Sequence, residues 1–391
     1  MKINRVAWRG YRVPFLWSPV AHGALRASHR HGLLIRITAD DGSTGIGEAS
    51  PIGAGSPTQL EEIAKIIKES AAALLGRELV GEYPRSLVFI RIGMLSAKLF
   101  PPQKSSPPAR AAGFGLETAM LDLVSRAMGW AFLEPKHPER IQRSAETPIR
   151  TNALITTSGY EELATEIELA RSQGMTSFKI KVGRRPLSEE LETLRAVREL
   201  AGSNATIRLD ANGLWTPDEA VAVLKRFKPF GIEYIEQPVS PEDPKGLAEV
   251  RRRSAVPIAA DEAVVSWPAV KKLIEIDAAD IFIVKAARLG FHHAVFLTSA
   301  LTKRNRTVVI TSSLESGIGI LAAAHLTKFL PLNAPACGLA TASLLEHDLL
   351  EAPLIVENGC LTLPQGPGIG AAVNPEALER YAVPPKGEVT E

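Results

Sequence analysis

Two lysines, Lys179 and Lys181, alternate with apolar residues in the stretch 178–183. Alternate residues of a strand face the same side, so both amines point one way and their apolar neighbours the other. Burial and mutual repulsion both disfavour the charged form of an amine, which lowers its pKa and makes a lysine base. The stretch alone also fits an edge strand protected by solvated lysines.

Three carboxylates and another lysine then follow, each at the end of its own apolar stretch: Asp210, Glu236, Asp261 and Lys285. A single acid at such a place is usually a turn or capping residue, but the regular series argues against separate accidents. In a βα barrel the C-terminal strand ends share one mouth, where catalytic groups lie. Carboxylate oxygens suit Mg²⁺ or Mn²⁺, so we expect a metal site made by the three acids.

These residue types together suit the removal of a proton from the carbon next to a carboxylate. Such a proton is too weakly acidic for an unaided lysine, and a metal ion with nearby ammonium groups stabilises the charge that forms. Lys181 precedes the acids in strand order and Lys285 follows them. We therefore expect the two catalytic lysines to face each other across the metal and a small carboxylate substrate.

Alternating strands and helices, which begin near Pro148, would position these residues. The predicted strands are 149–155, 177–182, 206–210, 232–236, 257–261, 280–285, 307–311 and 337–341, and the predicted helices are 160–172, 187–200, 217–227, 269–275, 291–303 and 317–329. Units about 25–30 residues apart favour a closed parallel barrel. An open doubly wound sheet would normally carry a Gly-rich phosphate loop after its first strand, and none is present.

The N-terminal part is predicted to be α+β. A strand at 5–13 precedes a hairpin of strands 31–39 and 43–49, with Asp40-Asp41-Gly42 as its turn, and helices are predicted at 59–75 and 115–128. The segment between the first two strands, residues 14–32, holds Trp17, His22, Arg26, His29 and His31. Its length and composition indicate a binding loop, which we expect to close over the barrel mouth and contact substrate.

Composition narrows the class of protein further. The 391 residues carry a formal net charge of +2 without a basic block, so nothing indicates a nucleic-acid partner. The chain begins without an apolar signal region and has no run of transmembrane length, so no membrane partner is expected. The two cysteines, Cys337 and Cys360, lack metal-ligand or redox spacing, which favours reduced thiols and a cytoplasmic location. Homo-oligomerisation stays open.

The lysine and carboxylate series resembles the enolase superfamily in its muconate-lactonizing branch. That branch carries Lys-x-Lys on the second barrel strand, acids on the third to fifth strands and a lysine on the sixth, as Lys179/Lys181, Asp210, Glu236, Asp261 and Lys285 are arranged here. The resemblance implies a (β/α)7β TIM-like barrel in residues 148–355, bound Mg²⁺, and an N-terminal α+β capping domain. That capping domain is expected in residues 1–130 and completed by residues 360–391.

Within the branch, three features resemble o-succinylbenzoate synthases: residues 311–319, residues 338–341, and Arg208 two positions before Asp210. By that resemblance Lys181 removes the α-proton and then protonates the departing hydroxide, in a dehydration of menaquinone biosynthesis. The substrate-binding residues expected are Lys179, Arg208, Ser312 and Ser313. Hydroxyls and a helix N-terminus near Gly317 would offer an anion site for a second carboxylate.

Other members of the branch remain alternatives. Dipeptide epimerases typically carry Asp-x-Asp near the eighth strand, and residues 337–342 contain no acid. Muconate cycloisomerases share the lysines, and some N-acylamino acid racemases perform both reactions. A non-catalytic, metal-binding barrel is a more remote alternative, because binding alone would not require a lysine on each face of the metal.

Overall fold

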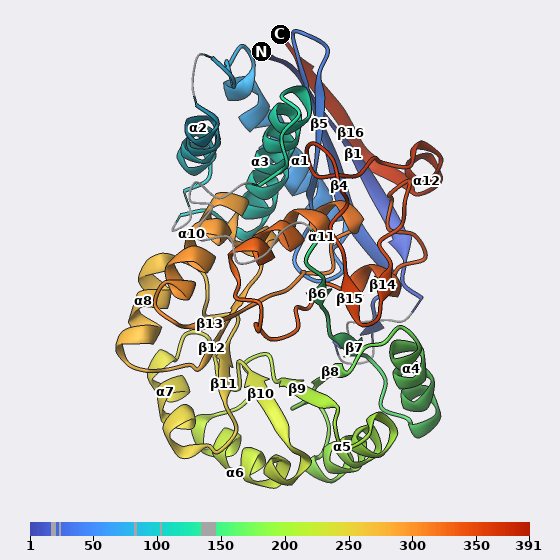
Figure 1. Cartoon of the computed structure of the whole chain (residues 1–391), viewed down its shortest axis with the longest axis vertical. Coiled ribbons are helices and arrows are strands. Elements are labelled where there is room, and N and C mark those ends of the chain that lie inside the picture. Colours follow the sequence, from blue (N-terminus) through green and yellow to red (C-terminus); the bar gives the residue numbers. More distant parts are fainter. Residues whose placement is uncertain (17–20, 23–24, 82–83, 102–103, 134–145) are drawn as a thin grey trace.

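The computed structural model describes residues 1–16, 21–22, 25–81, 84–101, 104–133 and 146–391. An antiparallel sheet with its helices forms the upper half in Figure 1, and a curled parallel sheet ringed by helices forms the lower half. Of the described helices, none combines the length and the apolar character needed to cross a membrane.

The lower half contains a parallel sheet of seven strands in the order β13-β12-β11-β10-β9-β8-β7. This is the predicted TIM-like architecture. The strands are β7 (Ala153–Ile155), β8 (Ser177–Lys181), β9 (Thr206–Asp210), β10 (Ile232–Glu236), β11 (Ile258–Ala260), β12 (Ile281–Val284) and β13 (Thr307–Ile310). The helices that follow them are α4 (Tyr160–Ser172), α5 (Leu187–Ala201), α6 (Pro217–Phe227), α7 (Pro244–Arg253), α8 (Trp267–Glu275), α9 (Ala286–Leu289), α10 (Phe291–Thr302) and α11 (Gly317–Ala324).

The predicted eighth strand at 337–341 is wrong as a regular strand, although its residues do close the sheet. Cys337 makes a single parallel bridge to Thr151, and Gly338 makes one to Thr311 beyond β13. The N–H of Gly338 donates to the carbonyl of Ile310 at 2.9 Å. Because a 3-10 turn begins at Thr341, the extended run is too short for a ladder, but it joins the two edges of the curled sheet.

The capping domain is built on the four-stranded antiparallel sheet β16-β1-β4-β5. Its strands are β1 (Ile3–Pro14), β4 (His29–Ala39), β5 (Thr44–Ala49) and β16 (Ala382–Thr390), and its helices are α1 (Pro57–Leu74), α2 (Arg85–Leu99) and α3 (Pro107–Ala127). The predicted β4–β5 hairpin is confirmed, and β16 pairs with β1 from the other end of the chain. The exact domain boundaries stay a prediction.

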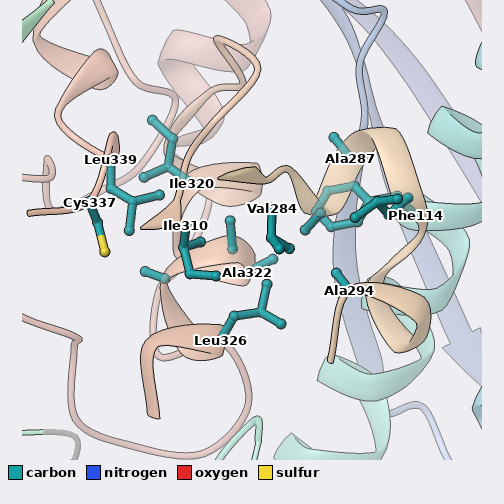
Figure 2. Packing of buried hydrophobic residues seen from close by; sticks show 14 of the residues in the cluster. Phe114, Val284, Ala287, Ala294, Ile310, Ile320, Ala322, Leu326, Cys337 and Leu339 are labelled. Carbon is teal, nitrogen blue, oxygen red and sulfur yellow. The ribbon is translucent and has the colours of Figure 1, made fainter. Parts of the chain in front are cut away.

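Helix α3 begins eight residues earlier than predicted and packs against the barrel. Ser106 caps it, and prolines occupy its first two positions, where no N–H donor is lost. Figure 2 shows Phe114 of α3 beside Ala287 of α9, within one buried apolar cluster. Since this cluster includes residues of both halves, apolar burial holds the capping domain against the barrel.

Candidate active site

The charged residues predicted to act together lie at neighbouring strand ends. Lys181, Asp210 and Glu236 are the last residues of β8, β9 and β10, and the sheet register pairs Asp210 with each of the other two. Asp261 and Lys285 directly follow β11 and β12. This common level results from the parallel sheet, in which the C-terminal strand ends share one edge.

One pocket lies at this edge, between the barrel and the capping domain. Six residues from the predicted site line it: Lys179, Lys181, Asp210, Lys285, Ser312 and Ser313. The other described residues that line it are Ile52, Gly53, Asn152, Leu154, Arg184, Asn212, Glu262, Arg288, Thr311, Leu314, Gly338 and Thr341. Glu236 and Asp261 are almost fully buried and contact the lining residues Lys179 and Lys285.

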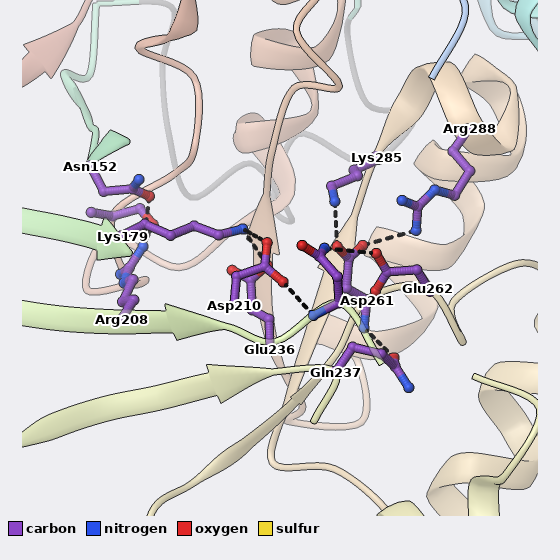
Figure 3. A network of polar contacts seen from close by, with 12 residues as sticks. Asn152, Lys179, Arg208, Asp210, Glu236, Gln237, Asp261, Glu262, Lys285 and Arg288 are labelled. Carbon is purple, nitrogen blue, oxygen red and sulfur yellow. Dashed lines mark hydrogen bonds and ion pairs between the residues drawn. The ribbon is translucent and has the colours of Figure 1, made fainter. Parts of the chain in front are cut away.

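Lys179 is bound between two carboxylates, as Figure 3 shows. Its Nζ lies 3.0 Å from Oδ2 of Asp210 and 2.5 Å from Oε2 of Glu236. Burial disfavours the charged amine, but the surrounding carboxylates outweigh it and raise the pKa of Lys179 well above its usual value. Lys179 is therefore a permanent cation in this arrangement and is unsuited to act as a base.

Lys181 differs from Lys179 although it faces the same side of the same strand. Among the described residues, no hydrogen bond or ion pair to its amine is found. Burial lowers the pKa of Lys181, and the charges of Lys179, Arg184 and Lys285 lower it further against the opposing effect of Asp210. This direction of shift favours the neutral amine that a general base requires.

Across the pocket, Lys285 and Arg288 both pair with Asp261. The Lys285 amine contacts Oδ2 of Asp261, and Nη1 of Arg288 lies 3.0 Å from Oδ1 (Figure 3). Burial would raise the pKa of Asp261, but these two cations lower it below its usual value. Arg288 was not predicted, although its position one helical turn after Lys285 placed it on the same face as that lysine.

The three acids have the chemistry of a divalent metal site. Burial, together with the charges of Asp210 and Asp261, raises the pKa of Glu236 to about 7 even though Lys179 opposes the shift. Carboxylates that disfavour one another's charge in this way would be stabilised by a divalent cation. As placed, however, the acids are paired with lysines and arginine, and the described residues contain no group of acidic, histidine or cysteine side chains already gathered as a metal cage.

Arg208, predicted to bind substrate, is not among the residues that line the pocket. Its guanidinium is 1% exposed, donates to Glu233 at 2.6 Å and to Asn152 at 3.0 Å, and lies over the ring of Tyr234. Asn152 does line the pocket. Arg208 therefore reaches the pocket through Asn152, a residue that the sequence analysis missed.

The part of the pocket wall formed by residues 311–314 and Thr341 carries hydroxyl groups. Oγ of Ser312 and Oγ1 of Thr341 lie 2.6 Å apart, while the buried hydroxyls of Thr311 and Ser313 have no hydrogen-bond partner among the described residues. The helix N-terminus that was expected to help bind a substrate anion is occupied by the protein itself, whereas substrate binding by the hydroxyls stays a prediction. The N–H groups of Ser316 and Gly319 donate to the protein's own Glu48, each at 2.9 Å.

The predicted binding loop at 14–32 is only partly described. Trp17 lies outside the described residues, as do the side chains of His22 and Arg26. From the described part of the capping domain, Ile52 and Gly53 reach the pocket. Substrate contact by the 14–32 loop therefore stays a prediction.

Comparison with known families agrees with this geometry. Residues 162–377, more than half of the chain, match the family described as enolase C-terminal domain-like. Residues 12–134 match the mandelate racemase / muconate lactonizing enzyme N-terminal domain. The chain belongs to the enolase superfamily. Members of this superfamily are enzymes that generally use Mg²⁺.

Individual relatives differ in the reaction that they catalyse. The chain is 36% identical over 215 residues to o-succinylbenzoate synthase of Thermobifida fusca, covering 54% of this chain and 66% of that protein. It is 26% identical to L-Ala-D/L-Glu epimerase of Bacillus subtilis, over 95% and 96% of the two chains. The structure of muconate lactonizing enzyme from Pseudomonas putida matches 98% of this chain and all of that one, with a TM-score of 0.82 at 24% identity. That last likeness speaks to the fold alone.

Proposed function

We propose that this enolase-superfamily protein is an o-succinylbenzoate synthase, a Mg²⁺-dependent dehydratase of menaquinone biosynthesis. The observation that carries the proposal is the unequal state of the lysines around one pocket. Lys179 is held by two carboxylates, Lys285 is held by Asp261, and Lys181 has no partner among the described residues. One free amine opposite one fixed cation suits a reaction with a single base.

The substrate of such a dehydration is a hydroxylated cyclohexadiene carboxylate with a succinyl chain. Lys181 Nζ accepts the proton from the carbon next to the ring carboxylate. On the opposite face Lys285, held by its ion pair with Asp261, stabilises the negative charge that develops there. Lys181 then returns its proton to the departing hydroxyl group, so that water leaves and the ring becomes aromatic.

Asp210, Glu236 and Asp261 would hold the metal ion. Bound there, Mg²⁺ would supply positive charge that stabilises the negative charge developing on the substrate. Lys179 pairs with both Asp210 and Glu236 and so opposes the effect of burial on the charge of these carboxylates. The hydroxyls of Thr311 and Ser313, which lack partners among the described residues, suit the succinyl carbonyl or carboxylate as hydrogen-bond donors.

The second candidate is an N-acylamino acid racemase, because Lys181 and Lys285 line the same pocket and could serve as two bases. Dipeptide epimerisation has less support, since Gly338 and Thr341 are the residues from the 337–342 segment that line the pocket and neither carries a carboxylate to pair with an ammonium group. Muconate cycloisomerisation uses the same lysines, so experiment must distinguish it from o-succinylbenzoate formation. Experiment also distinguishes a non-catalytic barrel from an enzyme.

The test is a panel of substrates assayed with Mg²⁺ and again after EDTA. We expect Mg²⁺-dependent formation of o-succinylbenzoate from its cyclohexadiene precursor, followed by absorbance. N-succinyl amino acids, Ala-Glu dipeptides and cis,cis-muconate test the alternatives. Turnover of one of these without o-succinylbenzoate formation would overturn the proposal. A protein with no turnover and no exchange of a substrate α-proton with D₂O would be the non-catalytic barrel.

A further inference from the structure

Glu48 is a fully buried carboxylate at the boundary between the capping domain and the barrel. It lies on β5 and accepts hydrogen bonds from both sides of that boundary. From the capping domain, Tyr11 donates its hydroxyl at 2.5 Å, and the Ser50 hydroxyl also contacts Oε1. From the barrel, Ser316 donates its N–H at 2.9 Å and its hydroxyl at 2.5 Å, and Gly319 donates its N–H at 2.9 Å.

These partners connect Glu48 to both protein segments that frame one side of the pocket. Ser50 leads into the turn that contains the pocket residues Ile52 and Gly53. The carbonyl of Gly53 accepts a hydrogen bond from the buried Arg30. Ser316 ends the loop that contributes Thr311 to Leu314 to the pocket wall. The neighbouring Glu315 fixes that loop from within, accepting from the N–H of Ser313 at 2.6 Å.

We propose that Glu48 is a positioning residue that sets the shape of the substrate pocket by fastening the 50–53 turn of the capping domain to the 311–316 loop of the barrel. Lys181 and the three acids lie on strands that this network does not touch. Substrate binding should therefore depend on Glu48, while proton abstraction should depend on it little. The inference rests on the proposed function only for its kinetic test.

The chemistry of the five donors explains why a carboxylate is needed here. Oε1 accepts from Tyr11, Ser50 and the N–H of Ser316, and Oε2 accepts from the hydroxyl of Ser316 and the N–H of Gly319. A glutamine would place an NH₂ group at one of these two positions. Hydroxyl groups can reverse their role, but a backbone N–H cannot. In either orientation the N–H of Ser316 or that of Gly319 would face another donor.

The packing around Gly319 indicates that the approach of Glu48 is part of the fold. A Cβ atom at Gly319 would lie 3.1 Å from Oε2 of Glu48 and 2.5 Å from Cβ of Glu315. A side chain at this position would therefore clash with Glu315 and crowd the Glu48 carboxylate. The absence of a side chain lets the capping domain reach the backbone of α11 directly.

Asp122 offers a matched control. It is equally buried and also belongs to the capping domain, on α3, but it is not among the residues that line the pocket. Its carboxylate accepts from the N–H groups of Ile46 at 2.9 Å and Ile369 at 2.7 Å, and it also pairs with Nε of Arg126 at 2.7 Å. Asp122→Asn disturbs a comparable acceptor without touching the 311–316 loop.

The test compares Glu48→Gln with Asp122→Asn by hydrogen–deuterium exchange and by kinetics. For Glu48→Gln we expect amide exchange across residues 311–319 to rise about tenfold or more. In the kinetic arm, KM should rise about tenfold, which corresponds to about 1.4 kcal/mol, with kcat within about threefold. Asp122→Asn should leave KM and the exchange of this loop unchanged.

Unchanged exchange of the loop in Glu48→Gln would overturn the inference, and so would an equal rise of KM in Asp122→Asn. If Glu48→Gln does not fold, Ser316→Ala replaces it, because that change removes one donor and keeps both N–H groups of α11. It should raise loop exchange and KM by smaller factors, and no change in either would overturn the inference. If the wild type makes no o-succinylbenzoate, the proposed function fails while the exchange experiment still decides the role of Glu48.

Discussion

Replacing Lys179 with methionine should destabilise the barrel by removing a charge at nearly constant volume. The lysine is 12% exposed, and its amine lies within 3.0 Å of both Asp210 and Glu236. Methionine is of similar length and adapts its shape to its surroundings, so little of the effect should come from a cavity. What changes is that two buried carboxylates lose the cation between them.

The expected magnitude follows from that geometry. Removing one partner of a buried ion pair costs about 3–5 kcal/mol of unfolding free energy. Because burial and neighbouring charges raise the pKa of Glu236 to about 7, a proton can replace the missing cation in acid. We therefore expect the full loss at pH 8 and a smaller loss at pH 5.5. Mg²⁺ should also reduce the loss, since it would bind the folded carboxylates preferentially.

The loss of unfolding free energy is measured by urea denaturation, monitored by circular dichroism, at both pH values and with either EDTA or Mg²⁺. Lys271→Met is the control, because Lys271 forms an exposed pair with Glu275 at 3.5 Å and should cost no more than about 1 kcal/mol. A Lys179→Met protein within about 1 kcal/mol of the wild type at pH 8 in EDTA would refute the reasoning. So would a loss that does not depend on pH.

Three further predictions concern catalysis, metal binding and acid stability. Lys181→Ala should abolish both turnover and α-proton exchange with D₂O. Lys285→Arg should retain more dehydration activity than Lys285→Ala, because the reaction needs only the positive charge at position 285. An equal loss of activity in the two Lys285 variants would instead indicate that Lys285 acts as a second base. Asp210→Asn should remove Mg²⁺-dependent activity and leave the far-UV circular dichroism intact, and retained turnover would exclude Asp210 as a metal ligand. Burial and Lys328 lower the pKa of His325 to about 3 from 6.5, so the unfolded chain binds a proton that the folded protein does not. Stability should therefore fall as the pH drops from about 6.5, by about 2 kcal/mol at pH 5, and His325→Leu should flatten the fall measured by urea denaturation.

Much of the barrel could be predicted because its pattern is local. Strands β9 and β10 and helices α4 and α6 have the predicted bounds, since a buried strand followed by an amphipathic helix repeats in the sequence. Helices α2 and α7 were missed. Helix α2 has no side-chain cap at Pro84 and so offers a weak start signal. Helix α7 does carry start signals, an Asp243 cap followed by Pro244, but it is short, buries only three residues and contains Gly246.

The sequence by itself determined which residues meet at the barrel mouth, because the strand ends of a parallel sheet share one edge. It could not determine which of two lysines with the same strand orientation stays charged. Lys179 lies two residues deeper in the strand than Lys181 and meets Asp210 and Glu236, whereas Lys181 has no partner among the described residues. The environment of a buried charge depends on side chains that other strands supply.

The start of α11 illustrates the same limit. Its hydroxyls and N–H groups indicated a site for a substrate anion, but the carboxylate found there is Glu48, 268 positions earlier in the chain. A helix N-terminus attracts any anion within reach. Only the docking of the capping domain on the barrel decides that the anion is supplied by the protein, because that contact joins segments with no local relation in the sequence.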